Sequence, residues 1–357
     1  MTKTPFVRIA KRDFIPLSRA WQIRGAGLLS ALILGSFIFI ALGHNPLAVY
    51  ADIINSVVGS RIGFNETVRI AVPLLGASLA VGLAFKMRFW NIGAEGQILA
   101  GGIAATYFAL FYYATFPRPL LLTIMGASAL IAGGLWGLIP AFFRTKWNTN
   151  ETLFTLMLNY IALGIVLYLQ SGPWRSVIMD FPIIDMFNTA ARLPRTGGIH
   201  IGWIIVLILT GSMYMYLSRT KHGYQIGVVG QSENTARYAG MNAGRIIMRT
   251  MFISGGIAGI VGFITVSGSD FTLNETTAGG VGFTAIIIAW ISRLNPLIMV
   301  LTAVFIAVLE RGAVRIQTTF MIPATIATVL IGIILFFMLA CEFFISYQVI
   351  FRKKEVV

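Results

Sequence analysis

The sequence predicts an all-α, polytopic membrane protein. Of its 357 residues, 57% are apolar and only 11% are charged, and the mean hydropathy is +0.82. A soluble chain of this length would need far more charge to cover its surface, so the apolar runs must face lipid or one another. A membrane helix needs about 20 mostly apolar residues, and the chain offers roughly eight to ten such runs.

The membrane runs leave little chain for a soluble domain, so we expect one transmembrane domain over 1–357. Basic residues crowd the segment 1–24, which we expect to be cytoplasmic. The run 25–43 that follows is long enough to stay as an anchor, and no small-residue cleavage site follows a short apolar core. Cys341 is the single cysteine, so no disulfide forms within the chain.

The apolar runs give about ten crossings, with both termini inside the cell. The expected segments are 25–43, 67–85, 95–114, 120–142, 151–170, 201–217, 250–267, 282–291, 297–309 and 322–348. Short basic clusters, such as Arg144 with Lys146, mark the cytoplasmic ends. They explain the net charge of +14 better than a nucleic-acid partner does, because they are not gathered on one face. The runs 282–291 and 297–309 are too short for simple spans, which predicts broken or re-entrant segments there.

A faint internal repeat is visible. Pro119-Leu120-Leu121 and Pro296-Leu297-Ile298 open two apolar runs, and near the same offset 73–83 parallels 253–263. Ten helices split five and five would make the halves inverted, around a central cavity. Chance similarity between glycine-rich helices is the alternative.

The most specific polar run is Asn91-Ile92-Gly93-Ala94-Glu95-Gly96-Gln97. Polar side chains at the mouth of a membrane helix cost free energy unless they are paired or hydrated. Such a loop can line a cavity, where broken helices expose backbone donors and acceptors. A helix cap is an equally weighted interpretation, with Asn91 as the N-cap and Glu95 in the first turns.

The next helix is expected to carry a polar stripe. Asn150 can cap it, and Thr152, Thr155 and Asn159 then recur at spacings of three and four. Hydrogen bonding between helices is the favoured interpretation, and a transport pathway is the alternative.

The longest expected cytoplasmic loop is 218–249. Ser232 or Asn234 can cap a short helix there, and Gly240 can end it. The expected face of this helix is Ala236, Tyr238, Ala239 and Met241. A short amphipathic helix between two spans is suited to dock a soluble partner; without one, it would lie in the lipid interface.

Taken in order, these segments resemble the ABC importer permeases for simple sugars and nucleosides. The resemblance spans 65–340, and the matching stretches are 91–97, 155–162, 230–241, 253–259, 282–286 and 295–297. The Met157-Leu158-Asn159-Tyr160 run, Gly172-Pro173-Trp174 and the long N-terminus are more similar to the nucleoside branch than to the ribose branch. The chain departs from the family pattern at Glu310-Arg311 and Arg315. We expect Glu310 and Arg311 either to shift the register of the last helices or to form the outer end of 297–309.

The resemblance implies a translocation subunit in the bacterial plasma membrane. It would pair with a second permease, identical or homologous, two ATP-binding cassette subunits and an external substrate-binding lipoprotein. No cofactor would bind this chain directly, because ATP would be used by the partners. The residues that match the coupling region of the family are Gly230, Asn234, Ala236, Tyr238, Gly240 and Met241.

A nucleoside path must be polar enough for ribose hydroxyls and flat enough for a base. The expected polar lining is Asn91, Glu95, Gln97 and Asn159, and the expected stacking groups are Phe154 and Phe283. No Gly-x4-Gly-Lys-[Ser/Thr] run is present in the sequence, so we expect no ATPase activity of its own. His44, His200 and His222 lack metal-ligand spacing.

Three alternatives stay open. An ABC permease for ribose or another simple sugar would share the same architecture. A secondary transporter would need intramembrane titratable groups, for which Glu95, Glu310 and Glu342 are the candidates. An intramembrane structural or assembly protein is the third class.

Overall fold

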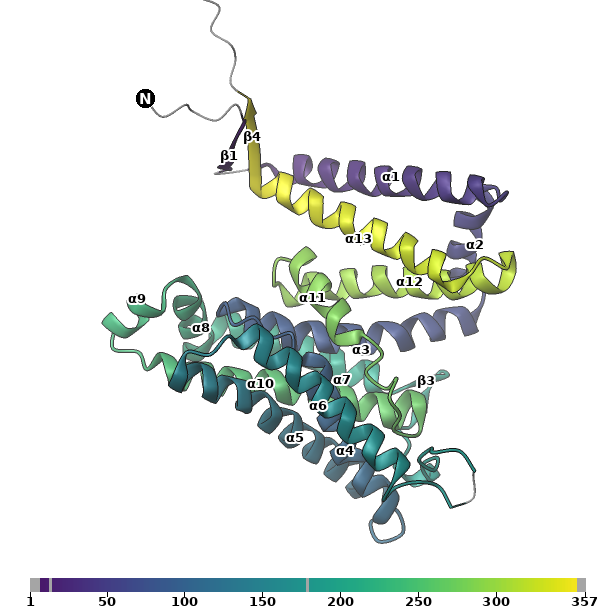
Figure 1. The fold of residues 1–357 in the computed structure, drawn as a ribbon, viewed down its shortest axis with the longest axis vertical. Coiled ribbons are helices and arrows are strands. Elements are labelled where there is room, and N and C mark those ends of the chain that lie inside the picture. The colour runs from purple at the N-terminus through teal and green to yellow at the C-terminus, as the bar shows by residue number, and fades with distance from the viewer. Residues whose placement is uncertain (1–6, 13–14, 178–179, 352–357) are drawn as a thin grey trace, which may run out of the picture. The chain divides into compact units, whose positions relative to one another are not determined.

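The computed structural model describes residues 7–12, 15–177 and 180–351, and helices dominate it (Figure 1). The helices are α1 (Leu17–Ala41), α2 (Pro46–Val58), α3 (Arg61–Lys86), α4 (Ala94–Phe111), α5 (Arg118–Trp147), α6 (Glu151–Ser171), α7 (Gly202–Arg219), α8 (Lys221–Gln231), α9 (Glu233–Tyr238), α10 (Ala243–Ile264), α11 (Val281–Ile291), α12 (Pro296–Phe320) and α13 (Ala324–Ser346). Within the described ranges, eight helices are long and apolar enough to cross a membrane. The helical, polytopic fold is confirmed, whereas the count of ten crossings stays a prediction.

Helix α2 is an element that the apolar runs did not reveal. The side chain of Asn45 accepts a hydrogen bond from the amide of Leu47 at 3.0 Å, and Pro46 occupies the first helical turn. An asparagine cap followed by proline is a recognised start signal of a helix, so the sequence itself indicated where α2 begins.

Helix α12 corrects the expectation that 297–309 is a short broken segment. It runs for 25 residues, so Glu310 and Arg311 lie inside it rather than at its outer end. Farther along the helix, the Arg315 guanidinium pairs with the Asp52 carboxylate of α2 at 3.0 Å. Helix α11, at 11 residues, is short as expected.

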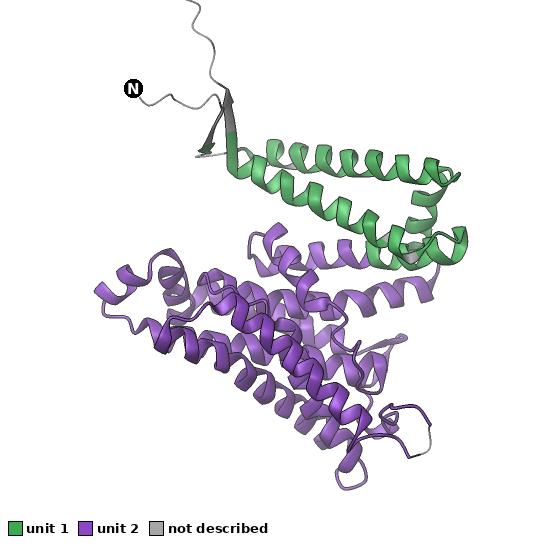
Figure 2. Ribbon diagram, viewed as in Figure 1, with its two compact units in different colours: residues 1–59, 309–357 green, residues 60–308 purple. Residues whose placement is uncertain are grey.

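The chain divides into two compact units, residues 1–59 with 309–357 and residues 60–308 (Figure 2). In the first unit, α1 and α13 lie side by side. Strand β1 (Val7–Lys11) pairs antiparallel with β4 (Tyr347–Phe351) and joins the two ends of the chain. The Arg24 guanidinium reaches the Glu342 carboxylate at 2.5 Å, which ties the two helices together. The single-domain expectation stays a prediction.

The second unit is built around α3 and α10. In the most apolar stretch of each helix, 78% of the residues are buried. Glycines let α10 touch its neighbours at the backbone: a Cβ at Gly259 would overlap the Ala129 carbonyl of α5, and one at Gly101 of α4 would overlap Gly259. Small residues at helix contacts are how membrane helices approach closely. The Ser254 hydroxyl donates to the Ala80 carbonyl at 2.7 Å, joining α10 to α3.

The inverted repeat also stays a prediction. Helix α4, which follows α3 in the chain, packs against α10. Helix α11, which follows α10, packs in turn against α3. This reciprocal packing is the kind of relation that two inverted halves would produce.

The end of α10 changes form before the chain leaves the helix. A π-helical turn covers Thr265–Asp270, and Phe271 has a φ of 55°. Against it packs the loop between α6 and α7, with a 3₁₀ turn (Thr189–Ala191) and a hairpin of β2 (Arg195–Thr196) with β3 (Ile199–His200). Two backbone bonds attach this loop: the Leu193 amide donates to the Ser267 carbonyl at 2.9 Å, and the Phe187 amide donates to the Phe271 carbonyl at 2.7 Å.

Candidate functional site

The polar run before α4 folds into a buried amide network. Asn91 and Gln97 are 0% and 1% exposed, and their side-chain amides bond to each other at 3.2 and 3.3 Å. The Asn91 Oδ1 also accepts from the Gly93 amide at 3.0 Å. The N-cap of α4 is Gly93, which makes no side-chain cap bond, so the expectation that Asn91 caps this helix is wrong. The Asn91 side chain instead closes the turn that precedes α4, because it accepts from the Gly93 amide.

Helix α6 completes the network from the other side. Thr155 accepts from the Ile92 amide at 3.2 Å. Asn159 donates to the Ile92 carbonyl and accepts from the Gly96 amide, both at 2.9 Å. The polar stripe on 151–170 therefore bonds helix to helix, as favoured from its spacing.

The glycines of this run allow α4 and the loop before it to lie close to α6. A Cβ on Gly93 would come within 2.9 Å of the Thr155 Cβ, and one on Gly96 within 3.1 Å of the Asn159 Cα. Both contacts are tighter than van der Waals packing allows, so a larger residue would push α4 away from α6 and stretch the bonds between them.

Glu95 reaches across the second unit to α11. Its carboxylate accepts from the amides of Gly280 and Gly282 at 2.6 and 2.7 Å, at the N-terminus of the short helix. A negative charge at this position satisfies orphan N–H groups and complements the helix dipole. Glu95 is thus both in the first turn of its own helix and the cap of another.

The remaining residues expected along the pathway lie apart from the network. The ring of Phe154 stacks on Phe143 of α5, with centroids 4.8 Å apart. Phe283 on α11 is 44% exposed. The structure brings Asn91, Gln97 and Asn159 together, connects Glu95 to α11, and leaves the two phenylalanines outside this group. Their role as a pathway lining stays a prediction.

An aromatic cluster next to the network was missed from the sequence. The indole rings of Trp90 and Trp290 stack at 5.7 Å and 24°, and Phe85 lies 5.3 Å from Trp90. The two tryptophans are 45% and 44% exposed, which leaves flat aromatic surface open. Trp90 stands directly before Asn91, so the usable signal was a tryptophan beside a polar run. Its partner is 200 residues away along the chain, and no local pattern pairs them.

The expected coupling loop contains two helices, α8 and α9. Thr220 caps α8 through the Gly223 amide, and Ser232 caps α9 through the Thr235 amide at 3.2 Å. Gly240 ends α9 with a φ of +73°, and Asn242 caps α10. The short helix and its glycine stop are confirmed, and of the two expected caps, Ser232 and Asn234, the structure has Ser232. Helix α8 was not predicted.

The six residues expected to couple to the ATPase fall into two groups. Asn234, Tyr238 and Gly240 are exposed, and Tyr238 is 94% exposed. Gly230 and Ala236 are buried, and Met241 is half-buried. The expected face of α9 is therefore split, because Ala236 points into the protein and Tyr238 points out. A Cβ at Gly230 would overlap the Lys86 carbonyl, so the end of α8 rests directly on the end of α3.

A polar cavity of about 190 Å³ lies where these helices meet. Its charged lining is Arg88, Arg144, Glu151 and Glu233. The Arg144 guanidinium bonds the Glu151 carboxylate at 3.1 Å and closes the turn between α5 and α6. His222 in α8 contacts the Tyr216 hydroxyl through Nδ1; burial first, and Arg249 second, lower the pKa of this imidazole.

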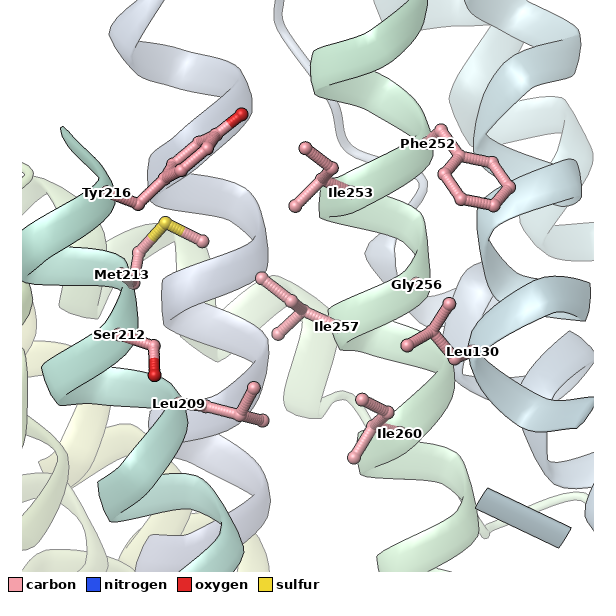
Figure 3. Close-up of a pocket in the computed structure, with 10 residues that line it drawn as sticks. All are labelled: Leu130, Leu209, Ser212, Met213, Tyr216, Phe252, Ile253, Gly256, Ile257 and Ile260. Atoms are coloured by element: carbon pink, nitrogen blue, oxygen red, sulfur yellow. The ribbon is translucent and has the colours of Figure 1, made fainter. Parts of the chain in front are cut away.

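A second cavity, of about 320 Å³, lies between α7 and α10 with Leu130 of α5 at its edge (Figure 3). Ser212 and Tyr216 supply its polar atoms, and leucine, isoleucine and phenylalanine line the rest. A sugar or nucleoside needs several convergent polar partners, so this cavity fits neither. Within the described residues, no group of three or more His, Cys, Asp or Glu is placed to hold a metal ion.

The opposite end of the second unit carries arginines. Arg118, Arg192 and Arg195 border a cavity of about 310 Å³ with Phe271, whose ring lies 4.7 Å from the Arg192 guanidinium and 5.3 Å from that of Arg195. The nearby imidazole of His200 is 3% exposed. Burial, followed by the charges of Arg195 and Arg69, lowers its pKa to about 4.

Comparison with known proteins now identifies the chain. Residues 64–339 match the family described as the permease component of branched-chain amino acid transport systems. A glucose ABC transporter permease, TsgB13 of Haloferax volcanii, is 31% identical over 96% of this chain and 93% of its own length. The guanosine ABC transporter permease NupP of Bacillus subtilis is 28% identical over 87% of this chain and 90% of its own. The nucleoside ABC transporter permease NupB of Lactococcus lactis is 29% identical over 89% of this chain and 90% of its own. The chain belongs to this family of multi-pass ABC transporter permeases, within the sugar and nucleoside branch.

Proposed function

We propose that this protein is the translocation subunit of an ABC importer and that its substrate is a nucleoside. The observation that carries the substrate choice is the exposed, stacked pair of Trp90 and Trp290 beside the buried amides of α4 and α6. Flat aromatic faces bind nucleobases by stacking, which is sequence-tolerant and favourable by about 1–3 kcal/mol per base. The guanosine and nucleoside permeases that resemble this chain add support.

A glucose permease is the second candidate, because TsgB13 shares 31% identity with the chain. Sugars also pack on tryptophan, but they present little flat apolar area and need more polar partners than bases do. In this chain, the amides of Asn91, Gln97 and Asn159 bond to one another and to backbone, which leaves few of them for sugar hydroxyls.

In this proposal, two ATP-binding subunits dock on α9, and ATP is used there rather than by this chain. The exposed side of α9, with Asn234, Tyr238 and Gly240, is the docking face. Its buried side transmits the motion. Because α8 rests on the last carbonyl of α3 at Gly230, a push on α9 is passed to the connection that holds Trp90 and Asn91.

The remaining partners are a second permease and an external binding lipoprotein, with the chain in the bacterial plasma membrane and both termini cytoplasmic. In this arrangement Arg118, Arg192 and Arg195 face outward. Helix α9 precedes the start of α10, whereas Phe271, which contacts Arg192 and Arg195 and lines a cavity with all three arginines, follows its far end. Figure 1 shows α9 and β3 at opposite ends of α10. A cluster of guanidinium groups suits an acidic face of the external protein.

Uptake by the complete transporter in proteoliposomes tests the proposal. Radiolabelled guanosine, adenosine and uridine should compete with one another, and a hundredfold excess of glucose or ribose should not displace them. Replacing the phosphate-binding lysine of the partner ATPase should abolish uptake. Competition by glucose would move the substrate to the sugar class, and uptake that survives the ATPase change but collapses with a proton uncoupler would favour an ion-coupled carrier.

The matched pair Trp290→Ala and Trp174→Ala separates the stacking platform from a general loss of aromatic area. Trp290 belongs to the stacked pair, whereas Trp174 lies near Tyr107 and Phe111 in another cluster. We expect Trp290→Ala to raise the KM for nucleoside about tenfold, in line with the loss of one stacking contact, and Trp174→Ala to leave it unchanged. Equal effects would remove the platform from the pathway.

A further inference from the structure

The groove between α1 and α13 joins an apolar floor to two arginines. It measures about 740 Å³, within the usual size of a ligand site. The apolar floor comes from both helices, and its main side chains are Ile23, Ala26, Phe336, Phe337 and Phe344. On α1, Arg19, Ile23, Ala26 and Ser30 recur at spacings of four, three and four, so they share one face of the helix.

Arg12 stands at the end of this groove where the two helices meet the β1–β4 pair. Its backbone amide donates to the carbonyl of Ser346, the last residue of α13, at 3.0 Å. Its side chain lines the groove, and its Nε is buried without a hydrogen-bond partner in the described structure. A buried guanidinium nitrogen without an acceptor is costly, and an anion at this end of the groove would supply the acceptor. Arg19, which is exposed, lines the same groove.

The β1–β4 pairing includes further basic residues of the sequence. In the β1–β4 register, Arg8 lies opposite Ile350 and Lys11 opposite Tyr347. The sequence continues beyond β4 with Arg352-Lys353-Lys354. Basic clusters directly beside membrane helices attract anionic lipid headgroups. The strand pairing therefore brings basic residues of β1 next to the strand that continues from α13.

We propose that this groove binds one anionic phospholipid. Its phosphate accepts hydrogen bonds from Arg12 and Arg19, and an acyl chain lies along the apolar floor between α1 and α13. Charge complementarity at one end of the groove and apolar surface along the rest match the two parts of such a lipid. The helices that form it are themselves candidate membrane spans with mostly exposed side chains, so lipid has direct access.

Native mass spectrometry of the purified protein in a neutral detergent tests this site without any need for transport. Phosphatidylglycerol is titrated against phosphatidylcholine with the same acyl chains, and against glycerol 3-phosphate, which has the headgroup charge without chains. We expect one phosphatidylglycerol to bind at least tenfold more tightly than either. Equal binding of the two lipids would overturn recognition of charge, and equal binding of glycerol 3-phosphate would make the site one for free anions.

Three variants locate the site. The double variant Arg12→Gln with Arg19→Gln should weaken phosphatidylglycerol about thirtyfold, since each arginine near an anionic surface contributes a factor of about five. Ala26→Trp fills the groove from an exposed position and should block binding while all charges remain. Arg219→Gln with Lys221→Gln removes two exposed cations from α7 and α8 and should leave binding unchanged. Equal loss in the two charge variants, with unchanged binding in Ala26→Trp, would mean that net charge alone attracts the lipid and would overturn the site.

A crosslinking measurement keeps the proposal falsifiable if the double variant does not fold. Phosphatidylglycerol with a photoreactive group in its acyl chain is bound to the unaltered protein and irradiated. Crosslinks should map to 19–30 and 336–344 by peptide mass spectrometry. Crosslinks that map chiefly to α5, α7 or α10, where the other apolar cavity lies, would overturn the assignment.

Discussion

The two units of this permease hold their helices together by different means. In residues 60–308, glycines bring α4, α5 and α10 into backbone contact, and buried side-chain amides join α4 to α6. In residues 1–59 with 309–357, ion pairs and a two-stranded pairing of the chain ends do this work. The backbone contacts at glycines leave no space for an added atom. The ion pairs, in contrast, join side chains that can readjust. The expected consequence is that residues 60–308, which house the candidate site, form a more rigid unit than residues 1–59 with 309–357.

The largest expected effect comes from adding one methyl group at a backbone contact. Gly259→Ala places a Cβ against the Ala129 carbonyl of α5, so the helices must separate or the protein must not fold. We expect a loss of more than about 3 kcal/mol, the range of severe overpacking. Gly164→Ala on α6 is the matched control, because a Cβ there meets no atom within 4 Å. Thermal unfolding in detergent, followed by size-exclusion chromatography, measures the Tm of both variants. We expect a lower Tm for Gly259→Ala and an unchanged Tm for Gly164→Ala. Equal Tm values would refute the glycine argument.

An ion pair in the other unit should cost less to break and should show compensation. Arg24 and Glu342 are 20% and 14% exposed at the side chain, so removing either one leaves a partly buried charge. We expect Arg24→Met or Glu342→Leu alone to destabilise by about 2–3 kcal/mol, and the double variant to recover part of that loss. A double-mutant cycle on Tm measures the coupling. Strictly additive losses would contradict the view that this pair joins α1 to α13.

Acid should destabilise the glycine-packed unit through His200. Its pKa of about 4 lies below the ordinary 6.5. Between these two pH values, His200 is protonated in the unfolded chain and neutral in the folded chain. The free energy of unfolding therefore falls as pH falls, by about 2 kcal/mol between pH 7 and pH 5. His200→Gln should flatten this part of the Tm–pH curve. An unchanged slope in His200→Gln would show that this imidazole is hydrated in the folded protein.

The smallest expected effect probes the amide network. Thr155→Val removes the acceptor for the Ile92 amide while it keeps the volume of the side chain. The expected loss of stability is about 1 kcal/mol, the usual contribution of one hydrogen bond, with a larger fractional loss of uptake because the start of α4 is loosened. Thr123→Val on α5, whose hydroxyl bonds only within its own helix turn at the exposed Pro119 carbonyl, serves as the control. A greater loss of stability in the control would argue against the network.

Much of the fold followed from local patterns. Runs of apolar residues identified the long helices, and the spacing of Thr155 and Asn159 identified a helix-to-helix contact. A cap and a glycine stop located α9. The errors came where local patterns conflict with packing. Charges at Glu310 and Arg311 suggested the end of a helix, but α12 continues through them to Phe320. Of the charged residues in this part of α12, Arg315 pairs with Asp52 of α2, a partner that no local pattern indicates.

The candidate site was predictable in its residues and not in its connections. Asn91, Gln97 and Asn159 stood out as polar groups in an apolar chain, and the structure joins them. That Glu95 caps a helix 185 residues away, or that Trp90 stacks on Trp290, has no local signature. Such pairs depend on which helices become neighbours, and a single sequence carries no direct record of that.

The sequence by itself determined the solvent and the helical class, because hydrophobic length and the scarcity of charge are local properties. It also located the polar residues and the short helix that distinguish this chain from an inert membrane anchor. Only the tertiary structure decided that the glycines serve backbone contact, that β1 pairs with β4, and that the side-chain amides of Asn91 and Gln97 bond to each other. The physical reason is distance: helix formation depends on neighbours within four residues, whereas these contacts join segments separated by tens to hundreds of residues.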